Sequence, residues 1–159
     1  MSGATPRQDG SPASAQDTAW AVGRAHRETV FAEYAKQQSV LLDALDARLR
    51  HLAWELPQRQ NARYPLQLAF FLCNGKAPCT HCPHPQWLRW IPNPKRLGRA
   101  IPARVVNPGR VLRGNPDAMA LYTEARKLIQ VRGDVLTAQT GLTRKVAAQF
   151  TQGVLRDAK

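Results

Sequence analysis

Three cysteines and two histidines lie within a single twelve-residue stretch. It runs Cys73-Asn-Gly-Lys-Ala-Pro-Cys79-Thr-His81-Cys82-Pro-His84. Thiolates and imidazoles are the ligands that zinc prefers, and the spacing of Cys79 and Cys82 suits two thiolates that meet one ion across a tight turn. Cys73 and one histidine would complete a closed, structural four-ligand site. We therefore expect zinc bound by Cys73, Cys79, Cys82 and His84, with His81 as the alternative fourth ligand.

Other interpretations of the cysteines remain open. An odd number of cysteines argues against a disulfide framework. They could be small apolar residues of a compact hairpin, or Cys79 and Cys82 could be a redox pair, although no βαβ pattern surrounds them. A hydrolase using Cys73 or Cys79 with His81 is a third possibility, which the crowding of three thiols disfavours.

The sequence lacks the motifs of the common enzyme classes. It has no glycine-rich phosphate loop followed by Lys-Ser/Thr, no Gly-x-Ser-x-Gly and no His-Glu-x-x-His. Nucleases and polymerases that use two metal ions need clustered carboxylates. The centre of the chain has none. We therefore predict a non-catalytic protein.

Positive charge is concentrated around the cysteines. The 159 residues include 23 Lys and Arg against 11 Asp and Glu, for a net charge of +12, and residues 57–116 hold ten basic residues and no acidic one. An ordinary solvated surface mixes both signs. A compositional bias toward arginine is the alternative, but it does not explain why the carboxylates stop at Glu55. This distribution favours a polyanionic partner, and nucleic acid above all.

The basic residues alternate with aromatic ones just after the cysteines. On a strand, Trp87 and Arg89 would share one face, and Leu88 and Trp90 the other. We expect Trp87 to face the ligand and Trp90 the core, although a tryptophan in such a setting often only packs. The residues predicted to contact nucleic acid are Lys76, Trp87, Arg89, Lys95, Arg96, Arg99, Arg104, Arg110, Arg113, Arg144 and Lys145.

Residues 134–150 partly match a helix-turn-helix motif. Gly141 would form the turn, and Arg144 and Lys145 would begin the recognition helix. Thr137 and Thr140 occupy positions that are usually small or apolar in the motif. We favour an ordinary helical core segment here and keep the motif as the alternative.

The remaining patterns predict the elements that position these residues. Residues 1–17 lack large apolar side chains and predict a disordered tail. Residues 18–56 carry apolar residues at helical spacing and predict a long helix, which either packs within the chain, as we favour, or forms a coiled coil. It should end before Pro57.

The rest of the chain predicts a small sheet followed by more helix. Prolines interrupt residues 57–116, where strands are expected at 66–72, 86–91 and 103–106. Asn115 caps the helical region 117–159, in which Gly133 and Gly141 leave open one long helix or several shorter ones. We expect a single domain over residues 18–159. Its class is mainly α, of the α+β type, with two long helices flanking a cysteine-rich, zinc-stapled β hairpin.

This order of elements resembles an uncharacterised group of small bacterial proteins often carried by mobile elements. The group has the pattern Cys-Gly-Lys-x-x-Cys-x-Cys, a later His-Gly-Pro and Tyr-rich residues, and the likeness covers residues 41–131. This chain departs from it by the inserted Asn74, by Cys-x-x-Cys in place of Cys-x-Cys, and by Trp87 and Trp90 in place of tyrosines. The resemblance implies the helix, cysteine hairpin, helix layout and a mobile-element setting, and no activity.

These observations lead to one functional expectation with two alternatives. We expect a non-catalytic DNA-binding protein, regulatory or accessory, of a plasmid, integrative element or phage. The alternatives are a protein interaction module, with the first helix forming a homodimer or docking on a partner, and an RNA-binding protein. No apolar run reaches the length of a membrane span and no signal-peptide pattern opens the chain, so a cytoplasmic protein without a membrane partner is expected.

Overall fold

A computed structural model of the chain describes residues 15–73, 79 and 81–157. The elements are α1 (Ala15–Gln58), β1 (Leu66–Phe71), β2 (His84–Pro92), β3 (Ala100–Arg104), α2 (Pro108–Val111) and α3 (Pro116–Asp157). The predicted class is confirmed: two long helices flank a small antiparallel sheet. Residues 1–14 of the predicted tail lie outside the described residues, and α1 begins at Ala15, three residues earlier than expected. The prediction that this helix ends before Pro57 is wrong, because α1 includes Pro57 and ends at Gln58.

The chain divides into two compact units, with the boundary inside α1 between Gln37 and Gln38. The first unit, as far as it is described, is the helical segment 15–37. Its exposed side chains include several large apolar ones: Trp20, Val22, Val30, Phe31 and Tyr34. The second unit contains the rest of α1 and all the other elements, including the cysteines and most of the basic residues.

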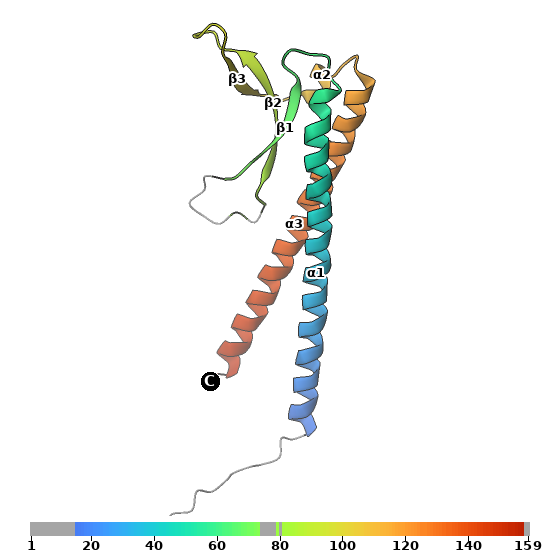
Figure 1. The fold of residues 1–159 in the computed structure, drawn as a ribbon. Helices are drawn as coiled ribbons and strands as arrows, with labels where there is room; N and C mark the ends of the chain where they lie inside the picture. The colour runs from blue at the N-terminus through green and yellow to red at the C-terminus, as the bar shows by residue number, and fades with distance from the viewer. Residues whose placement is uncertain (1–14, 74–78, 80, 158–159) are drawn as a thin grey trace, which may run out of the picture. The chain divides into compact units, whose positions relative to one another are not determined.

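The sheet of the second unit is a three-stranded antiparallel meander in the order β1-β2-β3 (Figure 1). All three strands were predicted, but β3 lies at 100–104 instead of 103–106. The predicted bounds were wrong: β3 begins three residues earlier and includes Pro102. An edge strand tolerates proline, which removes a hydrogen-bond donor that the ladder does not need there.

One face of the sheet packs against the helices. Leu66 and Leu68 of β1 are buried with Leu49, Leu52 and Leu56 of α1. The core also contains Ala118 and Ala125 of α3. Their small side chains let α3 approach the rest of the core closely. Trp87 of β2 packs against both parts of this core and meets the ring of Tyr122 edge-on, with centroids 5.0 Å apart.

Two polar side chains fix the connections between the elements. Gln60 donates to the carbonyls of Leu56 and Leu66 and accepts from the Leu66 N–H, which holds the link from α1 to β1. Asn115 accepts from the N–H of Ala118 at 2.9 Å, so the predicted N-cap of the second long helix is confirmed. Its amide also donates to the carbonyl of Arg59, which ties the start of α3 to the end of α1.

The helix-turn-helix alternative is wrong. Helix α3 continues without a break from Pro116 to Asp157, through Gly133 and Gly141. Among the described residues, positive φ angles occur only at Gly98 and Gly114, so Gly141 does not form a turn. A helix-interior glycine costs roughly 1 kcal/mol relative to alanine, which a helix of this length can absorb. Arg144 and Lys145 are exposed on this continuous helix.

An ion pair joins the two long helices. Arg48 of α1 donates to both carboxylate oxygens of Glu124 of α3, at 2.7 and 2.9 Å. The hydrogen bond from Arg48 lowers the pKa of the Glu124 carboxyl. A lowered pKa in the folded state means that the pair stabilises the protein at neutral pH, and that this contribution is lost as the pH falls through the folded-state pKa.

We expect Glu124→Gln to reduce the acid sensitivity of folding. Both side chains are about two-fifths exposed, so the contribution should be small, as is usual for ion pairs in contact with solvent. Urea unfolding midpoints at neutral and acid pH should differ less for E124Q than for the parent chain. Asp43→Asn, at an exposed α1 carboxylate without a described ion-pair partner, is the control and should keep the parent's pH dependence. Identical pH dependence of E124Q and the parent would contradict the prediction.

Candidate metal centre

The pairing of β1 with β2 brings the ends of the cysteine loop together. Phe71 lies opposite His84, and these two residues are the last of β1 and the first of β2. Cys73 therefore follows the paired strand by only two residues, while His84 is held in the sheet. The loop between them carries Cys79 and Cys82. Strand register thus places two of the four predicted ligands, and the loop supplies the other two.

The four predicted ligands form one cluster. The Sγ atoms of the three cysteines and a ring nitrogen of His84 all lie within 4.8 Å of one another. The His84 Nε2 atom is 2.8 Å from Cys73 Sγ and 3.3 Å from Cys79 Sγ. Cys73 Sγ and Cys82 Sγ are 3.3 Å apart. The cluster could hold a metal ion, and of the two candidate histidines it is His84 that supplies a ligand atom.

Hydrogen bonds inside the cluster affect the two exposed thiols in opposite ways. Hydrogen bonding to the backbone of His81, and then to Cys73 and His84, lowers the pKa of Cys79 to about 6. Hydrogen bonds to Cys82 and Cys79 raise the pKa of Cys73 to about 12. Three thiolates this close would repel one another, and Cys73 keeps its proton at neutral pH. A bound cation would remove this conflict, because a coordinating thiol is deprotonated outright.

A backbone hydrogen bond supports the fold of the cysteine loop. The N–H of Cys73 donates to the Sγ of Cys82 at 3.3 Å, so the first ligand residue contacts the third one through main chain as well as side chain.

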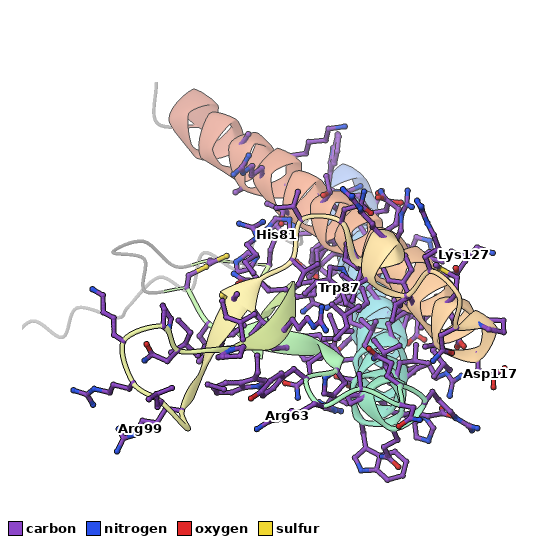
Figure 2. The ribbon with its side chains drawn as sticks, turned by 90° about the horizontal axis from the view of Figure 1, so that it is seen from above. Arg63, His81, Trp87, Arg99, Asp117 and Lys127 are labelled. Carbon is purple, nitrogen blue, oxygen red and sulfur yellow. The ribbon has the colours of Figure 1, made fainter. Side chains whose placement is uncertain are left out.

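Arg132 of α3 anchors this loop to the helices, and sequence reasoning missed it. Its side chain is buried, with a residue exposure of 5%. Its Nε donates to Asp46 Oδ1 of α1 at 2.6 Å, and its two Nη atoms donate to the carbonyls of His81 and Cys82 at 3.1 and 3.3 Å. The planar guanidinium fork can serve all three acceptors at once. One arginine therefore links α1 and α3 to the backbone at the ligand Cys82 and its neighbour His81. Figure 2 shows His81 close to α3.

The predicted basic residues lie on several parts of the second unit. Lys95, Arg96 and Arg99 are exposed in the turn between β2 and β3, and Figure 2 shows Arg99 at the end of this hairpin, away from the long helices. Arg104 is exposed on β3, and Arg110 and Arg113 lie at and after α2. None of these six forms an ion pair with another described residue. Lys76 lies outside the described part of the chain.

Arg89 has a structural contact. Its Nε donates to the carbonyl of Tyr64 at 2.9 Å, which links β2 to the segment before β1. Arg89 also lines an open hollow together with Gln60, Val111 and Asn115. One nitrogen of the Arg89 guanidinium is therefore used in a hydrogen bond that supports the fold. In this respect Arg89 differs from the cations of the β2–β3 turn.

The predicted roles of the two strand tryptophans are reversed. Trp87 lies opposite Leu68 on the face that packs against the helices, so the expectation that it faces a ligand is wrong (Figure 2). Trp90 is 39% exposed on the other face, where its indole N–H donates to Gln67 Oε1 at 3.2 Å. The alternation of side chains along the strand correctly predicted that Trp87 and Trp90 lie on opposite faces of the sheet. It could not predict which of the two faces the helices cover.

Comparison with protein-family models, curated proteins and solved structures finds no match for this chain. The site must therefore be interpreted from its own geometry. Within the described residues, neither long helix has a stretch apolar enough to cross a lipid bilayer.

Proposed function

We propose that this chain is a non-catalytic DNA-binding protein whose sheet and β2–β3 turn contact the phosphate backbone. The observation that carries the proposal is the separation of charges within the second unit. Its acidic residues with described side chains (Asp43, Asp46, Glu55, Asp117, Glu124 and Asp134) all lie on α1 and α3. The sheet and its connections carry cations and no carboxylate, which is the pattern that phosphate attracts.

Three of these six helix carboxylates also form ion pairs with arginines of the chain. Asp46 pairs with Arg132, Glu55 with Arg59 and Glu124 with Arg48. The cations of the β2–β3 turn have no described carboxylate partner, so binding phosphates there does not require breaking an ion pair. The release of counterions from DNA would then increase the affinity without being offset by the loss of ion pairs within the protein.

For the metal centre we propose zinc as the structural ion. Zn–S bonds of about 2.3 Å and Zn–N bonds of about 2.0–2.1 Å in a tetrahedron place neighbouring ligand atoms about 3.5–3.8 Å apart. The cluster of Cys73, Cys79, Cys82 and His84 is within 4.8 Å throughout, so small movements would seat the ion. Three thiolates and one imidazole leave no open coordination position. The ion would hold the loop between β1 and β2 in one conformation and so support the pairing of these two strands.

We expect neutralising the β2–β3 turn to weaken DNA binding and its salt dependence. The triple variant K95Q/R96Q/R99Q removes three unpaired cations, and each lost phosphate contact lowers the slope of log K against log salt by about 1. Affinity of the full chain for a random duplex, measured by fluorescence anisotropy at several salt concentrations, should show a slope smaller by about 3.

The matched control removes the same charge from the helices. R50Q/R126Q/K127Q neutralises three exposed cations on α1 and α3. It should change affinity and slope much less than the turn variant does. Equal losses from both triples would show that only net charge matters. If the parent chain shows no salt-dependent binding to duplex or to single-stranded DNA, DNA binding itself is refuted.

A second candidate function rests on the first unit. Residues 15–37 expose Trp20, Val22 and Val30, each more than half accessible. Apolar side chains of this size on an exposed helix favour a protein partner or a second copy of the chain. A chain that binds no nucleic acid, and whose self-association is lost in Trp20→Ser/Val30→Ser, would favour this interaction module.

The biological setting follows from the resemblance to the mobile-element group and is likewise our proposal. A regulatory or accessory role on a plasmid, integrative element or phage fits a small DNA-binding chain. RNA in place of DNA is tested by the same titrations with an RNA duplex.

A further inference from the structure

The second face of the sheet carries its own set of side chains. Strand register places Gln67, Leu88 and Arg104 in one cross-strand row. Trp90 and Pro102 form the next row along the sheet. Because directly paired residues share a face and neighbours along a strand alternate, all five belong to the face opposite Trp87. We call this set the outer face; the core draws its strand residues from the other side.

The outer face combines a fixed aromatic ring with an unpaired cation. Trp90 is 39% exposed, and its bond to Gln67 restrains the indole. Arg104 is the diagonal neighbour of Trp90 across β2 and β3, a relation that places Cβ atoms roughly 7–8 Å apart. Arg104 is exposed and forms no ion pair with a described residue. A flat ring and a guanidinium at this spacing match a base and the phosphate attached to it.

We propose that the outer face binds an unpaired nucleobase together with its phosphate, with Trp90 stacking on the base and Arg104 contacting the phosphate. This inference rests on the proposed nucleic-acid binding and names the form of nucleic acid that the sheet prefers. Inside a duplex both faces of each base are covered by its neighbours. Only an unpaired base can offer a face to a protein ring. The cations of the β2–β3 turn follow Trp90 along the chain and continue the path for the phosphates.

A preformed ring lowers the cost of binding. The Gln67 bond holds Trp90 before any ligand arrives, so less side-chain freedom is lost on stacking. The absence of carboxylates in residues 57–116 also removes the repulsion that phosphates would otherwise meet on this face. Trp54 gives the contrast: it is 66% exposed on α1, next in sequence to Glu55, and is part of no sheet surface.

The test compares two tryptophans in the full chain. Binding of short oligo(dT) and of a duplex of the same length is measured for the parent and for Trp90→Leu, Trp90→Phe and Trp54→Leu. Stacking on one ring is worth about 1–3 kcal/mol, so Trp90→Leu should weaken oligo(dT) binding about 5- to 150-fold. Trp90→Phe keeps a smaller ring and should retain part of the affinity. Trp54→Leu should bind like the parent, and duplex affinity should change little in every variant.

Arg104→Gln provides the second arm of the test. It should lower the salt slope of oligo(dT) binding by about 1 and leave in place, at saturation, the part of the tryptophan quenching that Trp90→Leu removes. Oligo(rU) in parallel distinguishes the two sources of an unpaired base: the tighter of the two oligomers identifies DNA or RNA. Circular dichroism confirms that each variant keeps its helices.

The outcomes separate this inference from the proposed function. If the parent binds neither single strand nor duplex, nucleic-acid binding fails altogether. If it binds duplex but not oligo(dT), or if folded Trp90→Leu binds oligo(dT) as tightly as the parent, the outer-face site is wrong while DNA binding stands. Equal losses from Trp90→Leu and Trp54→Leu would also overturn it.

Discussion

Replacing Arg132 by alanine should destabilise the second unit and weaken metal binding together. The variant leaves the Asp46 carboxylate without its partner and removes the donors to the His81 and Cys82 carbonyls. Breaking a buried ion pair by removing one partner costs about 3–5 kcal/mol. Because the side chain of Asp46 is 28% exposed and can regain water, we expect the lower end of this range, about 3 kcal/mol.

The effect on metal affinity follows from the same contacts. Arg132 holds the main chain at Cys82, so its loss frees the loop to sample arrangements in which the ligands do not converge. Outer partners of metal ligands typically contribute about 10- to 100-fold to affinity. Urea unfolding gives the change in stability, and competition with a chelator of known affinity gives the change in zinc binding.

Two further variants distinguish positioning from general stability. Arg132→Lys keeps the charge but loses the planar fork, so it should recover part of the stability and little of the zinc affinity. Arg126→Ala, at an exposed position on the same helix, should change stability by no more than about 0.5 kcal/mol. An Arg132→Ala protein that is destabilised yet binds zinc like the parent would show that the arginine stabilises the helices without positioning the ligands.

Arg132 also illustrates what the sequence alone could not provide. It lies 50 residues from Cys82 and 86 from Asp46 along the chain, so no local spacing relates the three. A lone arginine in a helical pattern is usually a solvated residue. Only the approach of α1, α3 and the cysteine loop in space makes it buried. By contrast, the cysteine and histidine ligands lie close in sequence, and residue types and spacing sufficed to predict their cluster.

The same distinction between local signals and contacts of distant segments applies to the fold. Local signals predicted the two long helices, the Asn115 cap and the strands, because each depends on residues within a few positions. Which strand face is buried depends on packing from distant segments, and the roles of Trp87 and Trp90 were therefore reversed. Gly141 suggested a turn, but α3 continues through it because helix formation is cooperative and one glycine costs little.

Removing one ligand should abolish zinc binding without melting the helices. The parent chain should purify with one equivalent of zinc, and Cys82→Ser or His84→Ala should hold less than half an equivalent. Neither core cluster contains a ligand, so the helical circular dichroism signal should persist. Zinc at a thousand times its dissociation constant stabilises the folded state by about 4 kcal/mol. That amount should be lost in both variants and when the parent is treated with chelator.

His81→Ala supplies the matched control for His84→Ala. The two histidines are three residues apart, but only His84 contributes a ligand atom to the cluster. His81 offers Arg132 its main-chain carbonyl, which alanine retains. His81→Ala should therefore keep one equivalent of zinc and most of the stability. A parent chain that holds less than half an equivalent and stays equally stable in chelator would falsify the zinc site, and equal zinc loss from both histidine variants would mean that the ligand set differs from Cys73, Cys79, Cys82 and His84.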